Sequence, residues 1–135
     1  KRVDVTASAE PQSPDVARAF EFGALATAAQ LVGAGQAMLD TAVEYAKQRS
    51  QFGTVIGTYQ AIKHKLADVL IAVEMARPLV YGAAIALAEG SADAARDVSA
   101  AKAAAADAAL LAARSALQTH GAIGFTQEHD LSLLL

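Results

Sequence analysis

Apolar residues recur every three or four positions along most of the chain, which is the spacing of one face of an α-helix. Between about residues 15 and 50 this face carries Ala28, Leu31, Gly35, Leu39, Ala42 and Ala46. Between about residues 58 and 89 it carries Ile62, Leu66, Val69, Val73, Ala76 and Val80. A third pattern, from about residue 92 to residue 119, is almost entirely alanine on its inner side. The pattern therefore predicts three long helices.

Residues that favour helix ends mark the boundaries of these segments. Ser13 is suited to cap the first helix, with Pro14 at its first position and Asp15 complementing the helix dipole. Gly90 is expected to end the second helix, and Ser91 to cap the third. The connections between the helices are therefore short.

Gly121 and Gly124 bracket a further turn, after which Thr126 is suited to cap a fourth helix that is cut off at the end of the sequence. Three long helices and the start of a fourth are typical of an up-down-up-down bundle. We therefore predict an all-α four-helix bundle whose last helix is truncated. Residues 1–12 form a polar lead-in or interdomain linker, and residues 13–135 form the bundle domain.

Glycine and proline inside the patterns need a separate explanation. Gly33 and Gly35 each weaken the first helix by about 1 kcal/mol relative to alanine, so close contact with another helix is expected there. Gly53 and Gly57 mark a loop between the first two helices. Pro78 removes a backbone donor inside the second helix and is predicted to kink it.

Composition and charge narrow the class of protein. The net charge of −3 argues against a nucleic-acid binder, which normally carries a basic face. The absence of cysteine excludes disulfides, thiolate catalysis and zinc–thiolate sites. We expect no apolar run to reach the roughly 18 to 20 residues of a membrane span, and we predict a cytoplasmic protein. Because the sequence begins at Lys1, it is expected to be a piece of something longer.

The segment around Arg49, Gln51 and Phe52 carries the most chemistry, because it places a guanidinium, an amide and an aromatic ring beside a glycine at a helix end. An Arg side chain matches two phosphate oxygens at once, and Phe52 could pack on a planar ring. From the residues alone, a cation at a helix C-terminus with a packed Phe is the favoured interpretation.

The remaining acidic and histidine residues do not form a convincing metal site. His64 is expected on the surface between two lysines, and His120 is placed to help cap the third helix. Glu128, His129 and Asp130 are consecutive, so on a helix they would point in different directions. We therefore expect no metal.

Three segments of the chain have a recognisable sequence. Residues 45–53 read YAKQRSQFG, residues 60–68 read QAIKHKLAD, and residues 118–130 read QTHGAIGFTQEHD. Together they resemble the acyl-CoA dehydrogenase family. The segments occur in the order and spacing of that family, and the resemblance covers residues 15–135.

The resemblance implies the C-terminal bundle domain of such an enzyme, which forms the tetramer core and completes the FAD site of a neighbouring subunit. The Arg of the first segment would contact the FAD pyrophosphate, and the third segment would lie on the AMP side. Ala122 replaces the second glycine of the family pattern, which implies a slightly looser approach there. The implied cofactor-binding residues are Arg49, Gln51, Phe52, Ile56, Tyr59, Gln118, Gly121 and Ala122.

The family's reaction removes the α proton of an acyl-CoA with a Glu base and passes the β hydrogen as hydride to the flavin, from which an electron-transfer flavoprotein takes the electrons. One family position for the base aligns with Gly23, and the Arg that follows it aligns with Ala24. Glu21 is two residues away, about 200° around a helix. The other family position lies beyond residue 135, so the catalytic base is unknown.

Three functions stay open from the sequence. The chain is either the C-terminal domain of an active dehydrogenase, a non-catalytic subunit of a hetero-oligomeric one, or a cofactor-free helical scaffold. Its last segment resembles an actinobacterial branch that handles bulky substrates such as steroid side-chain CoA thioesters. Alone, the chain is expected neither to bind FAD tightly nor to turn over substrate.

Overall fold

The computed structural model describes residues 14–126 and 129–135 of the chain. The predicted lead-in, the proposed cap Ser13 and Glu128 lie outside these residues. The elements, in chain order, are α1 (Pro14–Gln48), β1 (Ser50–Gln51), β2 (Thr54–Val55), the 3-10 turn η1 (Ile56–Thr58), α2 (Gln60–Glu89), α3 (Ala94–His120), and the 3-10 turns η2 (Gly121–Phe125) and η3 (Asp130–Leu133).

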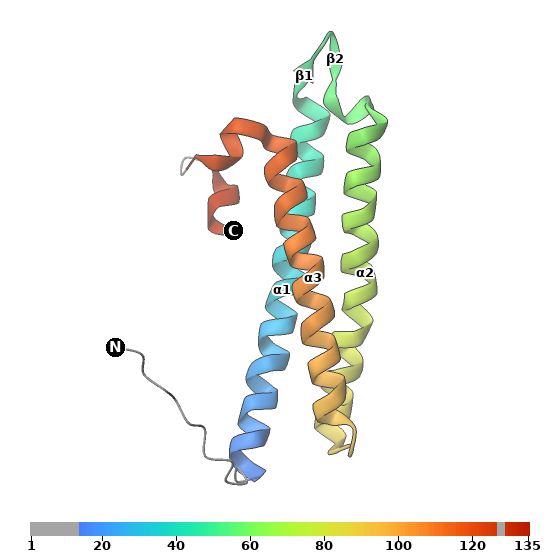
Figure 1. Ribbon diagram of the computed structural model, residues 1–135, viewed down its shortest axis with the longest axis vertical. Coiled ribbons are helices and arrows are strands. Elements are labelled where there is room, and N and C mark those ends of the chain that lie inside the picture. The colour runs from blue at the N-terminus through green and yellow to red at the C-terminus, as the bar shows by residue number, and fades with distance from the viewer. Residues whose placement is uncertain (1–13, 127–128) are drawn as a thin grey trace, which may run out of the picture.

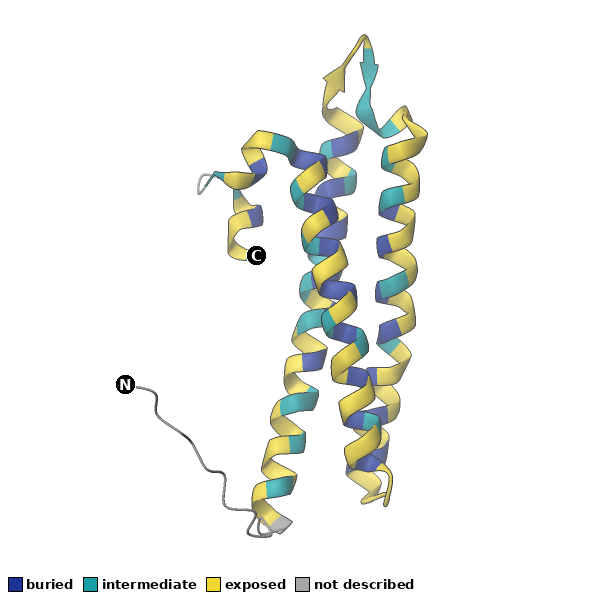
Figure 2. Cartoon of the chain, viewed as in Figure 1, coloured by how far each residue is buried: buried dark blue, intermediate teal, exposed yellow. Residues whose placement is uncertain are grey.

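The three long helices run antiparallel to their chain neighbours and form one bundle, with the hairpin at one end (Figure 1). Helix α3 packs against both α1 and α2, and the buried residues line the surfaces between the helices (Figure 2). Small side chains allow helix axes to approach closely, so the alanines on the inward face of α3 bring this helix near both α1 and α2. The all-α prediction is confirmed. The inward face of α3 consists largely of Ala94, Ala101, Ala105, Ala108, Ala109, Ala112 and Ala116.

The two glycines of α1 behave differently. A Cβ on Gly35 would lie 3.3 Å from Val73 Cγ2 and 3.7 Å from the Cα of Ala109, so the predicted close contact is confirmed there. A Cβ on Gly33 would meet nothing within 4 Å, so the same prediction is wrong for Gly33, whose side faces open space. Helix α2 continues past Pro78, and the kink stays a prediction.

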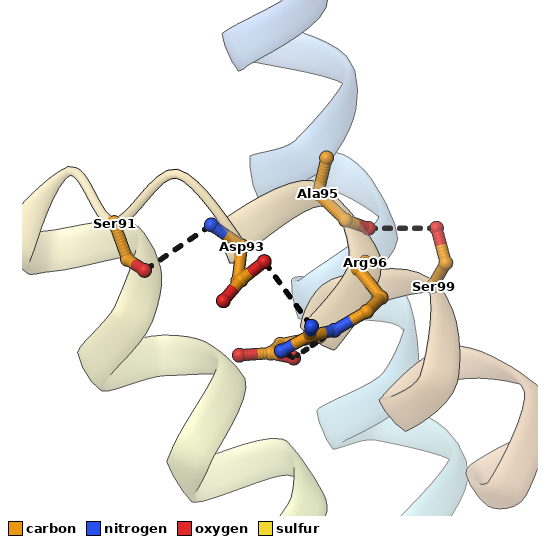
Figure 3. Close-up of polar contacts among 6 residues, drawn as sticks. Ser91, Asp93, Ala95, Arg96 and Ser99 are labelled. Atoms are coloured by element: carbon orange, nitrogen blue, oxygen red, sulfur yellow. Dashed lines mark hydrogen bonds and ion pairs between the residues drawn. The ribbon is translucent and has the colours of Figure 1, made fainter.

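The turn from α2 to α3 follows the predicted pattern with a shifted boundary. Gly90 has φ of 69°, and its left-handed conformation ends α2. The Ser91 hydroxyl accepts a 3.2 Å hydrogen bond from the Asp93 amide, which delays the start of α3 by two residues (Figure 3). Arg96 then pairs with Asp93 at 3.1 Å and Asp97 at 3.0 Å in the first turn of α3.

The residues after Thr126 do not begin an α-helix in the described part of the chain. Asp130–Leu133 form the four-residue turn η3, and Nδ1 of His129, the residue before it, accepts a 3.1 Å hydrogen bond from the Leu131 amide. So short a segment favours 3-10 hydrogen bonds over α-helical ones. Leu131 is fully buried, and it anchors the segment to the bundle.

Two helices are long and apolar enough to cross a membrane by length and composition, namely residues 15–48 and 60–89. The expectation that no segment reaches this length is therefore wrong on these two criteria. Bundle helices pass the same test, since alanine and leucine raise hydropathy in both settings, so the result is weak evidence for a membrane.

Candidate functional site

A tight hairpin follows α1 and determines where the Phe52 ring projects. Ser50 pairs with Val55 and Gln51 with Thr54, so only two residues form the turn. Phe52 has φ of 55° and Gly53 has φ of 83°, and positive φ at both central positions defines a type I′ turn. Glycine adopts this conformation freely, whereas phenylalanine does so at a cost of about 1–2 kcal/mol.

Packing of the Phe52 ring against the rest of the chain does little to offset this backbone cost. The residue is 94% exposed at the tip of the hairpin. Strained backbone that carries an exposed aromatic side chain is the kind of outlier that points to a functional position.

Backbone hydrogen bonds hold the base of this hairpin on both sides of Arg49. The Arg49 amide donates to the Tyr45 carbonyl at 2.9 Å, and the Arg49 carbonyl accepts from the Ile56 amide at 2.8 Å. The Tyr59 hydroxyl donates to the Gln51 carbonyl at 3.2 Å. The Arg49 side chain therefore starts from a fixed backbone.

The guanidinium of Arg49 is exposed, and no carboxylate among the described residues pairs with it. By contrast, Lys47 pairs with Glu44 at 2.6 Å, and Arg77 pairs with Glu74 at 3.0 Å. A free Arg fork beside an exposed aromatic ring suits a ligand that carries both phosphate and a planar ring system.

A cleft of about 390 Å³ lies where the ends of α1 and α3 meet the hairpin and the start of α2. We call it the hairpin cleft. Seven of the eight residues implied by the family resemblance line it. Its lining is Tyr45, Arg49, Gln51, Phe52, Ile56, Tyr59, Ile62, Thr119, His120, Gly121 and Ala122.

Gln118 is the implied residue that does not line the hairpin cleft. It is exposed on α3, one turn before Gly121, and its side-chain Oε1 accepts a hydrogen bond from Lys65 Nζ on α2. The side chain therefore lies on the seam between α2 and α3, beside the cleft.

His120 is a cleft residue that the sequence placed only as a helix cap. It is 4% exposed, and its Nδ1 bonds to the Ala116 carbonyl at 2.8 Å, so this nitrogen carries the proton. Its ring lies 4.5 Å from that of Tyr45 and 4.6 Å from that of His129. Burial lowers the pKa of His120 below its ordinary value of 6.5, and proximity to His129 adds to the effect. The residue is therefore a neutral, packed wall of the cleft.

Gly121 ends α3 with φ of 67°, which favours glycine at this position. Ala122 follows it on the cleft lining and is exposed. The backbone at this end of α3 thus lies open at the cleft.

A sequence model described as the C-terminal domain of acyl-CoA dehydrogenase matches residues 14–135. The chain belongs to the acyl-CoA dehydrogenase family. Acyl-CoA dehydrogenase IpdE2 of Mycobacterium tuberculosis is 40% identical over 124 residues, which are 92% of this chain and 37% of that relative. The chain therefore spans little more than a third of that relative.

Solved structures of the family have the same fold. Butyryl-CoA dehydrogenase from Megasphaera elsdenii superposes with a TM-score of 0.84 at 36% identity, covering 93% of this chain and 33% of that one. The ChsE4-ChsE5 complex from Mycobacterium tuberculosis gives a TM-score of 0.79 at 32% identity, covering 84% of this chain and 31% of that one.

Acyl-CoA dehydrogenases are in general FAD-dependent. The hairpin cleft fits part of such a cofactor, because it combines the unpaired guanidinium of Arg49, the exposed ring of Phe52 and an open backbone at Gly121. Arg49 is suited to the pyrophosphate and Phe52 to a planar ring. The cleft is open and contains no carboxylate, so it is suited to hold a cofactor edge and not to act as a base.

Proposed function

We propose that this chain is the C-terminal domain of an FAD-dependent acyl-CoA dehydrogenase, that it completes the FAD site of a neighbouring subunit, and that it forms the oligomer core. The unpaired guanidinium of Arg49, beside the strained and exposed Phe52, is the observation that carries this proposal. A cofactor-free scaffold has no use for either feature. FAD would supply the hydride acceptor of the reaction, and an electron-transfer flavoprotein would take up the electrons.

The distance along α1 supports a shared site. Ala24, which aligns with a residue of the family's active site, and Arg49 are about 37 Å apart at 1.5 Å per helical residue. That separation exceeds the diameter of a small domain. One cofactor would not reach both ends of α1, so the two ends serve different active sites.

The start of α1 offers no base for this chemistry. A hollow there is lined by Phe20, Gly23, Ala24, Thr27 and Lys102, and none of these side chains is a carboxylate. Glu21 does not line it, as the rotation along the helix predicts. The base of the parent enzyme would therefore come from outside this hollow.

An uncovered apolar stripe on α2 supports the oligomer. Ile71, Met75, Leu79 and Ile85 are exposed, and the first three follow one another at steps of four residues along one helix face. Exposed apolar patches of this kind typically mark a protein interface. We propose a tetramer in which another subunit covers this stripe.

The lack of a carboxylate in the lining of this hollow favours a second candidate, a non-catalytic subunit of a hetero-oligomeric dehydrogenase. The similarity to the ChsE4-ChsE5 complex supports this alternative. In that case the chain would still contribute Arg49 to a cofactor site. The acyl-CoA would then bind in the partner subunit's pocket, and steroid side-chain thioesters are one candidate class.

The test compares the parent protein with Arg49→Ala and with Arg114→Ala, in which an exposed Arg on α3 away from the cleft is removed. Flavin absorbance, molecular mass and acyl-CoA-dependent dye reduction are measured on each. We expect the wild type and Arg114→Ala to be yellow oligomers and Arg49→Ala to lose flavin. A wild type that is colourless and monomeric would favour the scaffold instead.

A further inference from the structure

Lys65 and Gln118 form a cross-helix contact beside the hairpin cleft. Lys65 lies on α2, one turn after the cleft residue Ile62, and Gln118 lies on α3, one turn before Gly121. Lys65 Nζ donates to Gln118 Oε1 across the seam between the two helices. The pair therefore lies one helical turn from the cleft residues Ile62 and Gly121, outside the cleft lining.

The contact decides which way the Gln118 amide faces. A lysine ammonium is only a donor, so it holds the carbonyl oxygen of the amide and leaves the two N–H groups of Nε2 free. Nε2 makes no hydrogen bond to any group in the described ranges. Gln118 thus keeps two unpaired donors next to the positive charge of Lys65, which suits a ligand with acceptor oxygens.

We propose that Lys65 is a positioning residue for the cofactor, which orients Gln118 so that its amide donates to an oxygen of the bound dinucleotide. This inference rests on the proposed FAD site and extends it to a residue outside the cleft lining. Without the ammonium, the amide is free to turn its carbonyl towards the ligand, where two acceptors would face each other.

The alternative is that Lys65 only ties α2 to α3. Four variants of the parent oligomer separate the two roles: Lys65→Met, Lys65→Arg, Gln118→Leu and the double variant Lys65→Met with Gln118→Leu. Lys63→Met is the matched control, because Lys63 lies on α2 two residues earlier and lines a different hollow. FAD affinity is measured by titrating the flavin-free protein, and unfolding is measured without flavin.

We expect Lys65→Met to weaken FAD binding by about tenfold, the order of one charge-assisted hydrogen bond. Lys65→Arg should retain affinity, because a guanidinium also donates to Oε1. Lys63→Met should bind like the wild type. The double variant should be no weaker than Gln118→Leu, because a positioning residue acts only through its partner.

Two results would overturn the inference while leaving the FAD site intact. One is that the wild type binds FAD and the Lys65→Met variant binds FAD with the same affinity. The other is a double variant whose loss is the sum of the two single losses, since Lys65 would then act on the ligand independently. A wild type without FAD affinity would overturn the proposed function and this inference together.

Discussion

A substitution in the strained turn at the hairpin tip should raise the stability of the folded chain and weaken cofactor binding. Phe52 adopts φ of 55° before Gly53, and Asn-Gly is the sequence that a type I′ turn favours. Replacing Phe52 by Asn should remove most of a backbone cost of about 1–2 kcal/mol. The ring is 94% exposed, so its removal loses only about 0.2 kcal/mol of apolar burial.

The net expectation for Phe52→Asn is a gain of about 1 kcal/mol in the free energy of unfolding of the flavin-free protein. For a domain of this size the gain corresponds to a rise of about 3–5 °C in Tm. FAD binding should weaken by about tenfold, because the ring that would pack on the cofactor is lost. Thermal unfolding followed by circular dichroism measures the first effect, and flavin titration measures the second.

Phe52→Tyr is the matched control, since it keeps the ring and the backbone cost and should change neither quantity. A lower Tm for Phe52→Asn would refute the strain argument, because the ring would then have to stabilise the folded chain. Unchanged FAD affinity would refute the role of the ring.

Two other changes test the packing and the electrostatics. A Cβ on Gly57 would lie 2.9 Å from the Ala46 carbonyl oxygen, so Gly57→Ala should lower the free energy of unfolding, measured by urea denaturation, by about 1–3 kcal/mol. Gly82→Ala is the control, because its Cβ would meet nothing within 4 Å and should not lower this free energy. Burial lowers the pKa of His120 below 6.5, so the unfolded chain binds more protons, and stability should fall as the pH drops from about 6.5 towards the lower folded pKa. His120→Leu should make the urea midpoint depend less on pH over this range than it does in the control His64→Gln. The same pH dependence in both variants would contradict a lowered pKa of His120.

The helices could be predicted because residues close together in the sequence determine where each helix lies and ends. Apolar spacing places Val69, Val73 and Ala76 on the face that is buried, and Gly90 ends α2 as expected. The hairpin was missed because strands of two residues are too short to show alternation. Gly53 and Gly57 marked a loop there, and Gly53 adopts a left-handed conformation in the turn.

The site could be predicted only as far as neighbouring residues determine it. Arg49 and Phe52 come from one short segment, and they line one cleft. Gln118 was implied by the family resemblance, and its role at the cofactor stays a prediction. Its contact with Lys65 could not be predicted, because the two residues are 53 positions apart in the sequence. The burial of His120 likewise depends on Tyr45, which belongs to another helix.

The alanine face of α3 has a consequence for how this bundle can vary. Alanine has no side-chain torsion that could rotate to make room, so a larger residue at Ala101, Ala105 or Ala112 must push a helix aside as a whole. In a saturation library, we expect these positions to accept little beyond Gly and Ser. The exposed Leu110 and Leu111 of the same helix should vary much more freely in the isolated bundle. Helix α3 would then move as a rigid body. A displacement of the helix at Ala94 would also displace Gly121, at the edge of the hairpin cleft.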